Sequence, residues 1–241
     1  MSGHSHWASI KHKKGAADAK RSKVFSKLSR EITIAAREGG GDITFNSRLR
    51  MVVEKAKSLN MPADNIDRSI KKGTGEIEGA ALEPVLFEAY GPGGVSIIIE
   101  GITDNKNRTL GEIKQILQSN GGKLVVEGAV KWLFDRKGIL SVDTTKNQKS
   151  KEDLEMAVIE AGAADTSWQD DTLEVYTAPE DLDKVQKALE GAGIAVESAM
   201  LGWIAKENVK IEEKDKEGCQ KLFEELDDND SVQEIYSNIE E

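Results

Sequence analysis

The spacing of apolar residues changes once along this chain, and that change constrains the fold more than any single motif. Before residue 74, apolar side chains recur every three or four residues, as on one face of an α-helix. Beyond residue 84, short runs rich in β-branched residues alternate with helix-like segments. The glycine-rich stretch 74–84 has no periodicity and indicates a linker. The sequence therefore predicts an α+β multidomain protein that begins with a helical bundle.

Three helices are expected in the N-terminal bundle, over residues 16–37, 47–59 and 63–72. Along the first, an apolar stripe has the spacing of one helical face, at Phe25, Leu28, Ile32 and Ala35. A basic stripe repeats this spacing in another phase, at Lys20, Lys23, Lys27 and Arg30. At about 100° per residue the two stripes point in clearly different directions. One face can therefore pack against the bundle while the other contacts phosphates.

Beyond the linker, two strands are expected over 84–90 and 95–102, joined by a tight glycine-rich turn. A polar surface loop at 104–108, which contains Lys106 and Arg108, could touch a partner. It should lead into a helix that starts at a capping box formed by Thr109 and Glu112. Alternating apolar residues then predict a strand over 129–135.

Residues 137–205 have the β-α-β-β-α-β order of a ferredoxin-like unit, with capping boxes at Ser150 and Thr177 starting its helices. The C-terminal remainder has no domain of its own to join, and we expect it to return to the sheet of 84–135. The predicted domains are thus a basic helical domain with an N-terminal arm (1–75), an α+β domain (82–136 plus 206–241), and a ferredoxin-like domain inserted in it (137–205).

Charge is distributed very unevenly over these domains. Residues 1–72 hold 16 Lys/Arg and 7 Asp/Glu, a net charge of +9, whereas the whole chain has a net charge of −10. The remainder therefore has a net charge of −19. Such a split is typical of a polyanion-binding domain on an acidic body, although a solvated helical face with no partner would show the same charges.

The N-terminal arm adds lysines and one aromatic residue to the basic helix. Lysine and arginine neutralise phosphates, and a tryptophan can stack on a base, although Trp7 could instead dock on the bundle. The predicted nucleic-acid-binding residues are Trp7, Lys11, Lys13, Lys14, Lys20, Arg21, Lys23, Lys27, Arg30, Lys106 and Arg108. The three histidines of the arm have no cysteine or carboxylate at ligand spacing, so no metal site is predicted.

Several classes of function are not supported by any motif. The chain has no nucleophile elbow and no P-loop, and its one cysteine, Cys219, lies far in sequence from any histidine. We therefore expect no enzyme, no cofactor and no small-molecule substrate. A lone cysteine fits a reducing compartment, and neither a membrane span nor a signal peptide is recognisable, so a cytoplasmic protein is expected. A monomer is slightly favoured.

Many short motifs, in order, resemble the YebC/PmpR family over about residues 1–140. They include Gly3-His4-Ser5, Ile10-Lys11-His12, Gly39-Gly40-Gly41-Asp42, Arg48-Leu49-Arg50, Asn60-Met61-Pro62, Tyr90-Gly91-Pro92-Gly93-Gly94 and Asp104-Asn105-Lys106-Asn107-Arg108. One departure is His6, where members commonly carry a lysine. The resemblance implies three domains, one helical and two α+β, with the third inserted in the second.

For function the resemblance implies nucleic-acid binding in one of two settings. Bacterial members are described as DNA-binding transcriptional regulators, while other members, including mitochondrial relatives, look like translation factors at the ribosome. The acidic body would be repelled by long duplex DNA but tolerated on a ribosome, which physically favours RNA. Both readings stay open, with a pure protein-interaction scaffold as a third.

Overall fold

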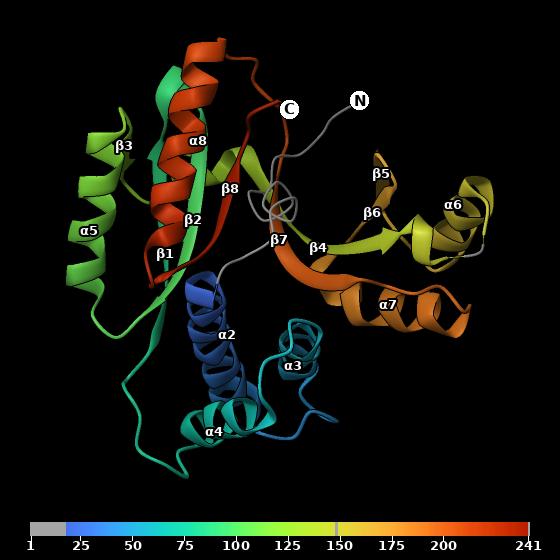
Figure 1. Cartoon of the computed structure of the whole chain (residues 1–241). Coiled ribbons are helices and arrows are strands. Elements are labelled where there is room, and N and C mark those ends of the chain that lie inside the picture. The colour runs from blue at the N-terminus through green and yellow to red at the C-terminus, as the bar shows by residue number, and fades with distance from the viewer. Residues whose placement is uncertain (1–17, 148, 241) are drawn as a thin grey trace. The chain divides into compact units, whose positions relative to one another are not determined.

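A computed structural model describes residues 18–147 and 149–240. Contacts divide the described part of the chain into two units, one of residues 134–208 and the other chiefly of residues 18–133 and 209–239. Each unit has its own antiparallel sheet, and Figure 1 shows the element order. The mixed α+β class predicted from the sequence is confirmed.

The N-terminal bundle consists of α2 (Asp18–Gly39), α3 (Ser47–Ser58) and α4 (Ala63–Thr74), close to the predicted helices. Its core takes the predicted apolar stripe of α2 together with residues of the other helices, including Leu28, Ile32, Leu49, Val53 and Ile66. At Gly73 a Cβ atom would lie 2.4 Å from the carbonyl oxygen of Thr33. Glycine at this position therefore lets α4 pack directly on the backbone of α2.

The same unit contains a sheet with the strand order β3-β1-β2-β8. Its strands are β1 (Glu83–Tyr90), β2 (Ser96–Thr103), β3 (Lys123–Val125) and β8 (Val232–Ser237). Apolar side chains of α5 (Lys106–Ser119) and α8 (Glu213–Asp228) pack against the sheet, and both helices lie on the same side in Figure 1. The C-terminal strand pairs with β2, as expected for a chain that returns to its first sheet.

The second unit contains β4 (Phe134–Asp143), α6 (Lys151–Glu160), β5 (Asp165–Gln169), β6 (Thr172–Thr177), α7 (Leu182–Gly191) and β7 (Ser198–Ala205). Its strand order is β5-β6-β4-β7, and all neighbouring strands are antiparallel. Leu140, Leu154, Val175 and Val185 are among the fully buried side chains of this unit. Residues of both the strands and the helices thus contribute to the buried interior of this unit.

The strand predicted over 129–135 is wrong for most of its length. Residues Lys131–Leu133 form a 3₁₀ turn, and the strand begins only at Phe134. The carboxylate of Glu88, buried within β1, accepts hydrogen bonds from the backbone N–H groups of Gly128, Val130 and Lys131. These N–H groups are not available to a strand ladder, because a distant carboxylate binds them.

Two predicted capping boxes are also wrong. Helix α5 begins three residues before Thr109, and Asn105 caps it by accepting a hydrogen bond from the N–H of Arg108. Thr177 donates to the neighbouring carbonyl oxygen of Ala178 instead of capping α7. Ser150 does cap α6, since its hydroxyl accepts from the N–H of Asp153 at 3.1 Å. A capping-box pattern identified the nearby helix in each case, but only one of the three starting residues.

Candidate nucleic-acid interface

The basic stripe of α2 contacts residues from the C-terminal part of the chain. The ammonium group of Lys27 lies 2.9 Å from the carboxylate of Asp227 and donates to its carbonyl oxygen at 2.8 Å. The side chains of Lys27 and Asp227 are only 14% and 19% exposed. Both charges are thus largely withdrawn from water and hold the end of α8 against α2.

Lys23, one turn earlier, makes a similar but more exposed contact. Its ammonium lies 2.9 Å from the carboxylate of Asp228, and the two side chains are 45% and 73% exposed. The pKa of Lys23 is raised, first by the hydrogen bond to Asp228 and also by the charges of Asp230 and Asp227. The acidic end of α8 therefore faces this part of the stripe.

Arg30 continues the stripe but binds neutral groups. Its guanidinium donates to the carbonyl oxygen of Ile102 at 2.9 Å and to the hydroxyl of Ser231 at 3.4 Å. Ser231 is buried, and its carbonyl oxygen in turn accepts from the N–H of Ile102. Arg30 thus links α2 to β2 and to the residue just before β8.

A partly buried charge network, which no pattern in the sequence indicates, lies next to this stripe. Lys55 of α3 pairs with Glu234 of β8 at 3.2 Å. Its pKa is raised, first by the charge of Glu31 on α2 and then by that of Glu234. The pKa of Glu31 is raised too, mainly because burial disfavours the carboxylate. We call Lys23, Lys27, Arg30 and Lys55 the paired face, because each has a partner beyond residue 100.

The remaining predicted residues fall into two groups. Trp7, Lys11, Lys13 and Lys14 lie outside the described residues, as does the side chain of Lys20. Arg21 is exposed on α2. That these residues bind nucleic acid together with Lys23, Lys27 and Arg30 stays a prediction. What the structure adds is that three stripe cations already contact carboxylate, carbonyl or hydroxyl oxygens of the same chain.

Lys106 and Arg108 belong to the first turn of α5 and not to a loop, as the sequence analysis had placed them. Both are exposed. Arg108 lies 2.5 Å from the carboxylate of Asp104 and 3.7 Å from that of Glu112. The pKa of Asp104 is lowered, first by the hydrogen bond from Arg108, with smaller help from the charge of Arg30. Acidic neighbours thus offset much of the positive charge of Arg108.

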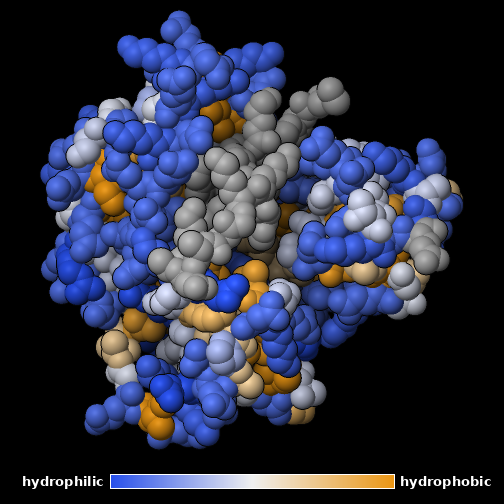
Figure 2. Space-filling view, in the orientation of Figure 1, coloured by the Kyte–Doolittle hydropathy of each residue, from blue (hydrophilic) through white to orange (hydrophobic). Residues whose placement is uncertain are grey.

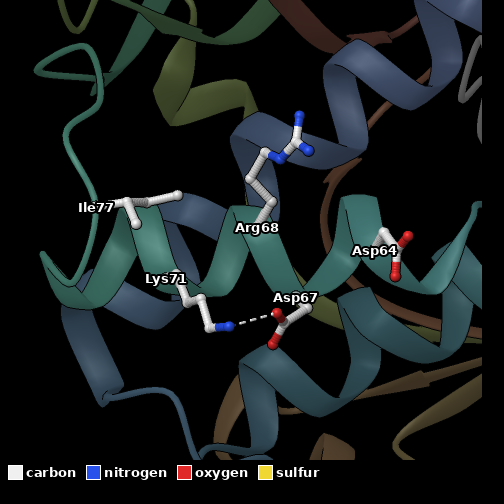
Figure 3. A pocket seen from close by; sticks show the side chains of 5 residues that line it. All are labelled: Asp64, Asp67, Arg68, Lys71 and Ile77. Atoms are coloured by element: carbon white, nitrogen blue, oxygen red, sulfur yellow. Dashed lines mark ion pairs between the residues drawn. The ribbon is translucent and has the colours of Figure 1, made fainter.

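A shallow depression with a volume of about 280 Å³ lies against α4. Figure 3 shows the ion pair between Asp67 and Lys71, 2.8 Å apart, with Arg68 pointing away from it. Asp64 and Ile77 complete the lining. Its charges are mixed and exposed, so the depression offers no enclosed site for a small molecule.

Other site types find little support in the described residues. They hold no group of three or more His, Cys, Asp or Glu side chains that could bind a metal ion. Cys219 is buried, burial raises the pKa of its thiol to about 11, and the thiol donates to the carbonyl oxygen of Pro92. It is therefore a protonated core residue and a poor nucleophile. Within the same residues no helix has the length and apolar character needed to cross a membrane.

Comparisons with known proteins cover nearly the whole chain. Residues 5–76 match a family model described as the TACO1/YebC protein N-terminal domain, and residues 82–239 match one described as the TACO1/YebC second and third domain. A relative from Caldanaerobacter subterraneus is 47% identical over 240 residues, which cover 100% of this chain and 98% of the relative. One from Desulforapulum autotrophicum is 49% identical over 241 residues, covering 100% of this chain and 96% of the relative.

Both relatives are named "Probable transcriptional regulatory protein". A crystal structure of a conserved hypothetical protein from Aquifex aeolicus is also similar, with 43% sequence identity and a TM-score of 0.89. The match covers 97% of this chain and 96% of that one. The chain is thus similar to these relatives in sequence, and to the Aquifex aeolicus protein in fold, over nearly its full length.

Proposed function

This chain belongs to the TACO1/YebC family, and from that premise we propose that it is a non-enzymatic, nucleic-acid-binding regulator of gene expression. Its relatives carry the name of transcriptional regulators, which supports a regulatory role. The observation that carries the binding proposal is the net charge of +9 on residues 1–72 of a chain whose total is −10. Positive charge concentrated on one domain attracts the phosphate backbone.

In this proposal the arm, Arg21 and the exposed end of the stripe make the first phosphate contacts. Lys23 suits this role because its pair with Asp228 is largely exposed, and exposed pairs are weak. Lys27 and Arg30 would join only if phosphates replaced their contacts with Asp227 and Ile102. All cations of the stripe can therefore bind phosphates only when these contacts with the C-terminal part of the chain and with β2 are broken.

The domain division belongs to the proposal as well. We infer a helical domain with an arm (1–75), an α+β domain (82–136 plus 206–241) and an inserted ferredoxin-like domain (137–205). The strand order β5-β6-β4-β7 supports the ferredoxin-like assignment, because the two central strands are the first and third of that unit. The pairing of β8 with β2 supports the insertion.

The nucleic acid is DNA if the protein is a DNA-binding transcriptional regulator, the reading that the names of its relatives favour. The second candidate is a ribosome-associated translation factor that binds rRNA or tRNA through the same domain. The net charge of −19 outside residues 1–72 favours this candidate, because long duplex DNA would repel such a body. Localisation in the cytoplasm suits both.

The binding proposal is tested with two triple variants of the full chain, Lys11→Ala/Lys13→Ala/Lys14→Ala and Lys20→Ala/Arg21→Ala/Lys23→Ala. Both should bind duplex DNA or an rRNA fragment more weakly, with a slope of log K against log salt reduced by up to about 3. A control, Lys184→Ala/Lys214→Ala/Lys221→Ala, removes the same charge from exposed positions outside the helical domain. Equal binding by all three variants and the unchanged protein would refute the proposal.

Sedimentation of the protein from lysate through a gradient separates the two candidates. Co-migration with ribosomes that RNase abolishes, and DNase does not, would make the translation role the main one. Loss of large complexes on DNase treatment alone would favour the transcriptional role. A protein that binds neither nucleic acid at any salt concentration would act as an interaction scaffold.

A further inference from the structure

The loop between α2 and α3 exposes an aromatic ring more fully than any other large hydrophobic side chain of the described residues. Phe45 is 88% exposed, and Ile43, two residues earlier, is 39% exposed. Single exposed hydrophobic residues are common and by themselves carry no functional meaning. Most of the face shown in Figure 2 is hydrophilic, as expected for such scattered residues. The case for Phe45 therefore depends on how the loop holds it.

The loop is braced on both sides of Phe45. The carboxylate of Asp42 accepts a hydrogen bond from the N–H of Thr44 at 2.8 Å, and the carbonyl oxygen of Asp42 accepts from Phe45 and Asn46. The buried amide of Asn46 donates to the carbonyl oxygens of Ala35 and Gly40 and accepts from the N–H of Leu49 in the first turn of α3. The backbone at Phe45 is thus fixed while its ring faces solvent.

The packing of two glycines keeps the loop in this position. A Cβ atom at Gly39 would lie 2.6 Å from the side chain of Asn46. At Gly41 it would lie 2.9 Å from Thr74 and 3.1 Å from Ile70, both near the end of α4. The loop therefore rests on two helices, and an exposed ring on such a support loses little conformational entropy when it binds a partner.

Two arginines follow Phe45 closely in the sequence, at the start of α3. Arg50 donates to the carbonyl oxygen of Ile43 at 3.4 Å, within the loop itself. Arg48 pairs with Glu38, and both side chains are about half exposed. Exposed pairs of this kind are worth little and exchange readily with other anions. We call Phe45, Arg48 and Arg50 the loop end of the bundle.

We propose that the loop end binds single-stranded nucleic acid, with the Phe45 ring stacked on an unpaired base and Arg48 and Arg50 next to the flanking phosphates. The inference rests on the proposed function and narrows the proposed partner from nucleic acid in general to single-stranded nucleic acid. Every base has a π-face, so one ring can bind strands of many sequences, whereas the bases of a duplex are already stacked on each other. A partner with a purely apolar pocket would make no use of the two arginines that follow Phe45 in the sequence.

The test uses the full chain and fluorescent 12-nucleotide probes, oligouridylate and oligodeoxythymidylate, with a 12-base-pair duplex for comparison. Phe45→Ala should weaken binding to both single strands about tenfold without changing the salt slope, because no charge is removed. Phe45→Trp should retain or strengthen binding. Duplex affinity should stay the same in both variants.

Val126→Ala is the matched control, since Val126 is 79% exposed and lies outside the bundle. It should bind all probes like the unchanged protein. Thermal unfolding should show that Phe45→Ala is folded, as expected for a side chain with so little buried surface.

Three results would overturn the inference. Unchanged single-strand binding by Phe45→Ala would show that the ring is not a stacking residue, and if ribosome association fell at the same time, the ring would be a protein contact. An equal loss for duplex and single strand would exclude stacking on an unpaired base. If the unchanged protein bound none of the probes at low salt, the proposed function would fail first and the inference with it.

Discussion

The paired face and the loop end belong to one small bundle and carry the same kind of charge, but the chain uses them differently. Cations of the paired face bind Asp227, Asp228, Glu234 and the backbone of Ile102. The arginines of the loop end contact residues of the bundle itself. A cation that already holds two parts of a fold together is costly to divert, whereas an exposed one is available to a partner. Charge counts alone do not distinguish these roles.

The largest effect is expected from breaking the most buried pair of the paired face. Lys27→Met removes both hydrogen bonds that Lys27 donates to Asp227, whose carboxylate is mostly shielded from water. We expect the free energy of unfolding, measured in urea, to fall by about 3 kcal/mol, within the usual range for a broken buried pair. Lys57→Met removes an exposed lysine from α3 and should change it by less than about 0.5 kcal/mol. If Lys27→Met lowered the free energy of unfolding no more than Lys57→Met, the pair with Asp227 would not contribute to stability.

Lys55→Met should have the next largest effect. It leaves Glu31 and Glu234 close together without the ammonium that offsets their charges. Because 39% of the Lys55 side chain is exposed, water compensates part of the lost interaction. We therefore expect the free energy of unfolding to fall by about 2 kcal/mol. Adding Glu31→Gln to Lys55→Met should recover part of that loss. If the double variant were no more stable than Lys55→Met, the two side chains would not be coupled.

The pH dependence of Glu31→Gln gives a smaller effect with a definite sign. The pKa of Glu31 is raised in the folded protein, so the folded state binds its proton more tightly than the unfolded state does. The tighter proton binding stabilises the folded protein fully at a pH below the pKa of Glu31 in the unfolded state. This stabilisation is lost as the pH rises through the pKa of Glu31 in the folded state. Glu31→Gln should therefore be at least as stable as the unchanged protein at pH 7 and lose that advantage as the pH falls toward 4. A constant difference between pH 4 and 7 would contradict the raised pKa.

These residues also show what the sequence could and could not predict. The helices of the bundle followed from the spacing of Phe25, Leu28 and Ile32, because local periodicity reports which face is buried. The return of the C-terminal strand followed from the absence of another sheet for it to join. Neither inference needed to know which distant residues touch.

The features that the sequence did not predict depend instead on contacts between residues far apart in sequence. The partner of Lys27 is 200 residues away, and Glu88 binds N–H groups about 40 residues away. Periodicity predicted that Lys27 lies on a different face of the helix from the apolar stripe, but not that α8 ends against that face. The exposure of Phe45 likewise depends on the hydrogen bonds of Asn46, which no spacing rule reveals.

The smallest effect is expected from removing one exposed ion pair from the paired face and one from the loop end. Lys23 and Arg48 are 45% and 50% exposed, and the carboxylates that they pair with are exposed too. Lys23→Ala and Arg48→Ala should therefore each lower the free energy of unfolding by no more than about 1 kcal/mol, and 0.5 M salt should remove most of that loss. The variants should differ in binding, since only Arg48→Ala removes a cation of the loop end. We expect Arg48→Ala to reduce the salt slope for oligouridylate by about 0.7, while a duplex should respond more to Lys23→Ala. If both variants affected both probes equally, the two surfaces would form one continuous polyanion site, and the distinction between them would apply only to folding.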